Sequence, residues 1–181
     1  MHEELSHVSD IDLKLAAEYF SKLSYTRWTR VIEAARVPKT HRDNFTLAVT
    51  EGLGTEPIGN RVIVVPANLK RTMLGDTRSG YVAYVPPGSI EMGAKIAAHG
   101  VGTAPACEGC HGVKLEGQTM PGIGIVPPLA GRMPNYIVRE LMWFREGKRT
   151  DPAATPMRAE VSHLTLKDMI DVAAYAASCK P

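Results

Sequence analysis

Apolar residues recur with helical spacing near both ends of the chain. In residues 8–23 the positions i, i+3, i+4 and i+7 are held by Leu13, Ala16, Ala17 and Phe20. In residues 166–178 the apolar stripe consists of Met169, Val172, Ala173 and Ala176. This spacing predicts two amphipathic helices, and Ser9 and Thr165 are placed to cap their N-termini.

Two further helices are expected in the second half of the chain. Residues 90–100 are rich in Ile, Ala and Gly at helical spacing. Asn135 can cap a helix that continues to about Glu146, where Gly147 is a typical stop signal. Between these two helices, residues 112–131 are rich in glycine and proline, so we expect a loop there.

The middle of the chain, residues 24–87, follows a different pattern. Residues 25–37 are compatible with one helical segment, whereas residues 61–66 and 81–85 are rich in β-branched and aromatic side chains and are expected to be short strands. From residue 24 to residue 89, nine Lys and Arg stand against five Asp and Glu. We therefore expect a loop-rich, mildly basic connector with a solvated surface.

Composition narrows the possible classes of protein. The chain has 181 residues, of which 44% are hydrophobic, enough for a core of ordinary size. Its net charge of +2 argues against a nucleic-acid-binding surface. No apolar run approaches the length of a membrane span, and the acidic, polar residues 1–10 do not resemble a signal peptide.

Residues 107–111 read CEGCH, a C-x-x-C-H sequence. This is the attachment motif of a c-type haem, in which two cysteines three apart form thioethers with the haem vinyl groups. The histidine that follows directly is then the proximal ligand of the iron. Cys107, Cys110 and His111 are therefore the candidate cofactor-binding residues, and the motif predicts a protein that moves single electrons.

Other uses of two neighbouring cysteines have less support. A dithiol redox pair would favour a βαβ context, which the pattern around residue 107 does not predict. A structural zinc site needs two more ligands, and Cys179 with His163 makes a poor second half. We expect Cys179 to be an apolar residue at a helix end. The sequence has no arrangement typical of hydrolytic catalysis, so we do not expect an enzyme.

The two terminal segments are an internal repeat. With an offset of 156, residues 1–22 align without a gap on residues 157–178, and seven of the 22 pairs are identical. The caps and the apolar stripes of the two predicted helices coincide as well. We therefore interpret residues 1–23 as the last helix of a domain like residues 88–181, with the rest of that first domain truncated, and the export signal and a first haem motif in the missing part.

A haem iron held by His111 needs a sixth ligand. The candidates that follow it are Met120, Met133, Met142, Met157, Met169 and His163. Met157 is favoured because it is expected in a flexible loop after Pro156 and because the repeat pairs it with Met1. A thioether is a soft, neutral ligand that favours ferrous iron and raises the reduction potential.

The environment of the haem can be anticipated in part. The second ring nitrogen of His111 is expected to be held by a backbone carbonyl, which residues 127–131 could supply. Helix-face and neighbouring residues are the candidate pocket walls: Leu129, Tyr136, Ile137, Leu141, Phe144 and Tyr175.

Residues 88–181 resemble a class I cytochrome c domain of the cytochrome c4 and c553 type, in which two such domains are often joined in tandem. The resemblance rests on GSIEMGAKIAAHG, CEGCHG, VPPLAGRMPNYIVRELMWFREGKR and TPMRAEVSHLTLKDMIDVAAYAAS, in this order. It implies a mostly α fold, with short helices around a covalent haem. It also implies that Met157 is the distal ligand, that Pro128 supplies the carbonyl partner of His111, and that Gly93 and Tyr175 mark the crossing of the first and last helices.

The resemblance also implies organisation and function. Residues 1–23 would be the remnant of a first cytochrome c domain, 24–87 a connector, and 88–181 a cytochrome c domain with one haem c, a second being expected in the full-length protein. The expected function is one-electron transfer in the periplasm, or in another exported location, between redox partner proteins. The alternative is a haem-bearing, electron-accepting subunit or module of a periplasmic dehydrogenase or oxidase complex. A haem-based sensor would favour an open sixth position, against which Met157 argues.

Overall fold

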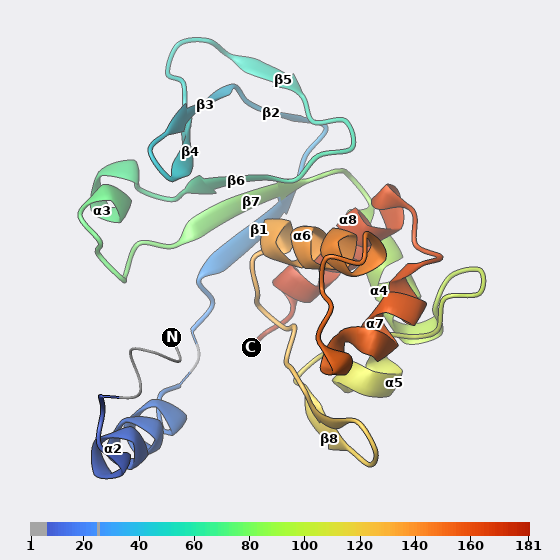
Figure 1. Cartoon of the computed structure of the whole chain (residues 1–181). Helices are drawn as coiled ribbons and strands as arrows, with labels where there is room; N and C mark the ends of the chain where they lie inside the picture. Colours follow the sequence, from blue (N-terminus) through green and yellow to red (C-terminus); the bar gives the residue numbers. More distant parts are fainter. Residues whose placement is uncertain (1–6, 25) are drawn as a thin grey trace.

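The computed structural model describes residues 7–24 and 26–181. Its C-terminal half is helical, and the segment before it forms short strands (Figure 1). The helices of the C-terminal half are α4 (Ser89–His99), α5 (Glu108–His111), α6 (Pro134–Arg145), α7 (Thr155–Val161) and α8 (Leu166–Ser178). The mostly α class I cytochrome c fold expected for residues 88–181 is confirmed.

Helices α4 and α8 cross at the centre of the helical part. A Cβ atom on Gly93 of α4 would lie 1.9 Å from the Asp171 carbonyl oxygen and 2.8 Å from the Cβ of Tyr175, both on α8. Only glycine permits so close an approach of the two backbones. The expected crossing at Gly93 and Tyr175 is therefore confirmed.

The substitution Gly93→Ala should destabilise the protein by about 3 kcal/mol or more, because the added methyl group meets rigid backbone rather than a flexible side chain. The free energy of unfolding from denaturant titration measures this. Gly109→Ala is the matched control, since a Cβ there meets nothing within 4 Å. Equal loss of stability in both variants would contradict this account of the crossing.

The hydrophobic core of the helical part is formed by residues of α6, α7, α8 and the loops between the helices. The predicted stripe of α8 is almost completely buried, with Met169, Ala173 and Ala176 at 0% exposure. Ile137 and Leu141 of α6 pack in the same cluster. The N-terminus of α8 is closed by a capping box, in which the Thr165 hydroxyl and the Asp168 carboxylate each accept a backbone N–H of the other residue.

The connector forms a small β structure with its own core. Strand β7 (Tyr81–Val85) is central in a three-stranded sheet, with β1 (Thr29–Glu33) parallel to it and β6 (Ile63–Pro66) antiparallel to it. Two smaller pairs are formed by β2 (Arg36–Pro38) with β5 (Thr55–Pro57) and by β3 (Thr40–Asp43) with β4 (Thr46–Val49). A short helix, α3 (Leu69–Met73), follows β6.

The two strands expected in the connector are therefore observed, but the connector contains more strands than the sequence predicted. Residues 29–33 and 36–38 are strands, so the interpretation of residues 25–37 as a helix is wrong where the structure describes it. Apolar residues of this part form a separate buried cluster: Val37, Ile58, Ile63, Val65 and Val82. The connector also packs on the helical part, through β1 against α8 and through Glu33, whose carboxylate accepts the Ile90 N–H at 2.8 Å.

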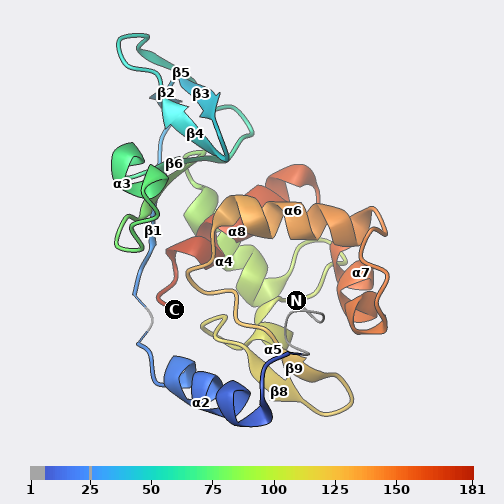
Figure 2. The same cartoon turned by 60° about the vertical axis from the view of Figure 1, so that its left-hand side comes forward.

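The N-terminal helix, α2 (Asp10–Ser21), lies within the expected range, and Ser9 caps it by accepting the Asp12 N–H. None of its residues is buried. Its exposed large apolar residues are Ile11, Leu15, Tyr19 and Phe20. Figure 2 shows α2 at the opposite end of the molecule from β2 and β5. Among the described residues, no helix is both long enough and apolar enough to cross a membrane.

Candidate functional site

The C-x-x-C-H sequence forms a single turn of helix. Cys107 is the N-cap of α5, and its carbonyl accepts the His111 N–H at 2.9 Å. Cys107 and Cys110 are thus three residues apart on one helical turn, which places their side chains on the same side of it. Both are free and half-buried. This is the arrangement that two thioether bonds to one planar group require.

The imidazole of His111 is held in a defined orientation. The residue is 5% exposed, and its Nδ1 lies 2.9 Å from the carbonyl oxygen of Pro127. A carbonyl can only accept, so Nδ1 carries the proton, and Nε2 keeps the lone pair that a metal ligand needs. Burial lowers the pKa of His111, while the hydrogen bond to Pro127 acts in the opposite direction. The neutral ring is favoured, and it fits the proximal ligand of a haem.

The carbonyl partner of His111 is Pro127, so the expectation of Pro128 is wrong by one residue. The Pro128 carbonyl instead accepts the Nε–H of Arg132 at 2.7 Å. The chain turns at this point, because the N–H groups of Leu129 and Ala130 both donate to the Leu115 carbonyl, at 2.8 and 3.1 Å. Because of this turn, the carbonyls of Pro127 and Pro128 point in different directions, and only the Pro127 carbonyl faces His111.

Met157 lies in a helix and not in the expected loop. Pro156 stands in the first turn of α7, a position that suits proline because its missing N–H would have no intrahelical partner there. Met157 is partly buried and packs against the core cluster, as does Cys107. The pKa of the Cys107 thiol is raised to about 11, mainly by burial and to a smaller extent by the carboxylates of Glu108 and Glu160. Glu160 belongs to α7, so the helix with Met157 lies close to Cys107.

Comparison with known proteins agrees with this geometry. The family model described as cytochrome c matches residues 90–180. This chain belongs to the cytochrome c family. The match begins in α4 and ends after α8, so it includes the C-x-x-C-H turn, the Pro127 loop and α7.

The curated relatives of this cytochrome include cytochromes c4 and c-552. Cytochrome c-552 of Acidithiobacillus ferridurans is 40% identical over 74 residues, which are 41% of this chain and 29% of the relative. Cytochrome c4 of Stutzerimonas stutzeri is 32% identical over 102 residues, 55% of this chain and 47% of the relative. The chain therefore spans less than half the length of these relatives. Cytochrome c4 of Acidithiobacillus ferrooxidans, a solved structure, is 32% identical with a TM-score of 0.41 over 50% of this chain and 49% of that chain. The c4-like, class I identity expected from the sequence is confirmed.

One residue that supports the cytochrome motif was not anticipated. The predicted loop contains a β-hairpin of β8 (Gln118–Met120) and β9 (Gly124–Val126). The side-chain amide of Gln118 donates to the carbonyls of Gly109 and Cys110, at 3.2 and 3.0 Å. These carbonyls end the α5 turn and would otherwise lack intrahelical partners. The alternation of polar and apolar residues in so short a hairpin gave no usable signal.

The other candidate sixth ligands occupy different settings. His163 is exposed between α7 and α8, and Met169 is completely buried in the core. Met142 lies on α6, partly buried against the core. Tyr136, expected as a pocket wall, is 41% exposed and lies under the Arg139 guanidinium. The remaining expected walls belong to the core cluster or pack against it: Leu129, Ile137, Leu141, Phe144 and Tyr175.

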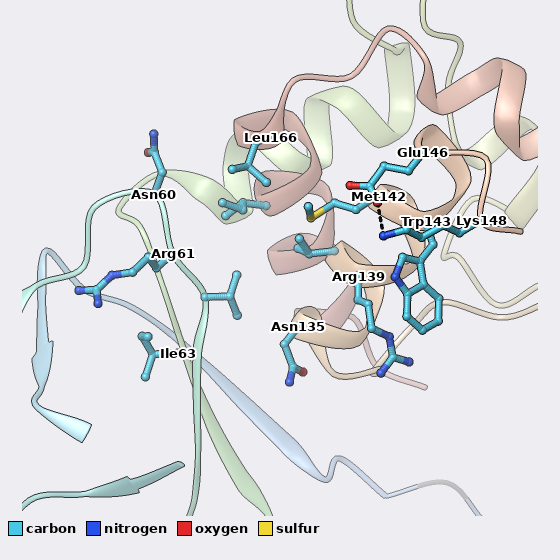
Figure 3. Close-up of a pocket in the computed structure, with 13 residues that line it drawn as sticks. Asn60, Arg61, Ile63, Asn135, Arg139, Met142, Trp143, Glu146, Lys148 and Leu166 are labelled. Carbon is cyan, nitrogen blue, oxygen red and sulfur yellow. Dashed lines mark ion pairs between the residues drawn. The ribbon is translucent and has the colours of Figure 1, made fainter. Parts of the chain in front are cut away.

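A cavity of about 470 Å³ lies between the connector and the cytochrome domain (Figure 3). Its lining comes from residues 60–63 and from α6, α8 and the loop after α6. On α6, the Arg139 guanidinium lies 4.8 Å from the centre of the Trp143 ring. Of the candidate sixth ligands, Met142 lines this cavity, whereas Cys107, His111 and Met157 do not. In the described residues, no group of three or more His, Cys, Asp or Glu is arranged to hold a metal ion.

Proposed function

We propose that this cytochrome carries single electrons by outer-sphere transfer through one covalently bound haem c. Cys107 and Cys110 supply the thioether bonds, His111 is the proximal ligand and Met157 the distal one. The observation that carries the proposal is the His111 ring, buried and held by the Pro127 carbonyl directly after a turn with two free thiols.

Each residue has a distinct part in this function. The haem supplies an iron that changes between ferric and ferrous states. The Pro127 carbonyl fixes the tautomer and orientation of His111 and increases the basicity of Nε2. The thioether of Met157 favours the reduced state, and the core around α6 and α8 keeps water away from the site. Ligation by His111 and Met157 would leave no open position for a substrate, which suits a carrier.

The proposal extends to setting and organisation. The chain works in the periplasm or another exported location, with redox partner proteins as donor and acceptor. Residues 24–87 connect the cytochrome domain of residues 88–181 to α2, which we interpret as the last helix of a first cytochrome c domain. Support for this comes from the caps, since Ser9 and Thr165 accept the N–H groups of Asp12 and Asp168 in the same way. The apolar face that is buried in α8 is largely exposed in α2.

Covalent attachment can be tested directly. The chain expressed with a c-type haem attachment system should give a pyridine haemochrome spectrum typical of two thioether bonds. Its intact mass should exceed that of the polypeptide by one haem. The double variant Cys107→Ser with Cys110→Ser is the control and should lose the covalent haem. An unmodified wild-type mass, or a mass raised by zinc alone, would contradict the proposal.

A further inference from the structure

Met157 lies next to an arginine that ties α7 to the preceding loop. We propose that Arg158, acting with Arg149 and Glu140, is a positioning residue that holds the Met157 thioether at the haem iron. This inference rests on the proposed function, because it takes Met157 as the distal ligand.

The guanidinium of Arg158 makes two bonds in different directions. Its Nη1 donates to the carbonyl oxygen of Arg149 at 3.1 Å, and its Nη2 donates to the Thr155 hydroxyl at 2.9 Å. The first bond crosses from α7 to the loop after α6, and the second holds the first residue of α7. A planar guanidinium suits this role because its donors have a fixed geometry.

The loop is in turn fixed on α6 through the side chain of Arg149. Its Nη1 lies 2.6 Å from Oε2 of Glu140, and its guanidinium lies 4.9 Å from the centre of the Phe144 ring. The side chain of Glu140 is only 13% exposed and also pairs with Arg139 at 3.0 Å. Restricted exposure and two cationic partners make this a firmer anchor than an isolated surface ion pair. The path from α6 to α7 therefore runs through Glu140, Arg149 and Arg158.

Helix α7 needs such an anchor. It has seven residues, too few for a helix to be stable by itself in water. Val161, at its last position, is 1% exposed and fixes that end in the core, whereas Thr155 and Pro156 at the other end are exposed. Met157 lies near the exposed end. Without the bonds of Arg158 this end should fray, and Met157 should leave the iron more often.

The rate at which imidazole replaces Met157 on the ferric holoprotein measures this release. At saturating imidazole the observed rate is limited by the departure of the thioether. Arg158→Gln should raise the limiting rate about tenfold, which corresponds to the loss of one hydrogen bond from a charged donor. Arg158→Lys keeps one charged donor and should give an intermediate rate. Lys148→Gln is the matched control, since Lys148 is an exposed cation of the same loop that pairs with Glu146 and not with this network.

A double-variant cycle tests the path. Glu140→Gln alone should also accelerate exchange, and combining it with Arg158→Gln should add little, because both changes break one series of contacts. The inference would be overturned if Arg158→Gln exchanged imidazole at the wild-type rate, or if Lys148→Gln accelerated the exchange equally. It would also be overturned if the effects of Glu140→Gln and Arg158→Gln were fully additive. A thioether bound to ferric iron gives a weak sulfur-to-iron absorption band. If the wild-type ferric protein lacks this band, the proposal that Met157 is the distal ligand is wrong, and the positioning role of Arg158 is wrong with it.

Discussion

The variant His111→Ala is expected to abolish stable haem incorporation. The Nε2 of His111 is the proximal ligand in the proposed site. Thioether bonds to Cys107 and Cys110 could still form, but the iron would lose its strong proximal ligand. The yield of holoprotein, measured as the ratio of haem absorbance to polypeptide, should fall by at least about tenfold.

The control for this prediction is His163→Ala. His163 is exposed between α7 and α8, so its removal should leave haem content unchanged. A normal yield of holoprotein with a normal spectrum from His111→Ala would refute the assignment of the proximal ligand. A loss of haem in both variants would indicate a general failure of folding or maturation.

The helices that build the site could be predicted because their signals are local. Residues 166–178 were expected as the last helix, and α8 has these bounds. The expected range of α4 differs from the observed one by one residue at each end, whereas α6 begins two residues earlier and ends one residue earlier than expected. In α6 the difference has a clear cause, since Pro134 takes the first helical position ahead of the expected cap, Asn135. Periodicity, caps and stop signals lie within a few residues of each other, so no distant contact is needed to interpret them.

The connector could not be predicted in the same way because its signals are distant in sequence. Strand β1 pairs with β7, whose residues follow it by 52 positions, as in the pair Thr29 and Tyr81. Val31 and Ile32 have the β-branched side chains of a strand, but they fit a short helix face almost as well. The pairing that decides between these alternatives forms only when the intervening chain folds back.

Details of the site depended on single turns of the backbone. Pro127 and Pro128 are chemically equivalent as suppliers of a carbonyl, and only the turn made by Leu129 and Ala130 shows which one faces His111. Pro156 was interpreted as a sign of a loop before Met157, whereas proline also begins helices, as it does in α7. A motif thus identifies the ligands of a haem more readily than the groups that hold those ligands in place.

The variant Met157→Ala is expected to keep the covalent haem but to lower the reduction potential. A thioether stabilises ferrous iron, and its loss leaves the sixth position to water or to another weak ligand. Because axial ligands set haem potentials over a wide range, the potential should fall by on the order of 0.1 V. The weak sulfur-to-iron absorption band of the oxidised protein should disappear. Potentiometric titration followed by optical spectroscopy measures both changes on one sample.

Two controls separate ligation from packing. Met157→Leu keeps most of the side-chain volume against the core but provides no ligand, so it should lower the potential as Met157→Ala does while retaining more stability. Met92→Ala removes an exposed methionine of α4, with 44% of the residue accessible, and should change neither band nor potential. If both Met157 variants left the band and the potential unchanged, the sixth ligand would be another residue. Met120 and Met133, both partly exposed, would then be the next residues to replace.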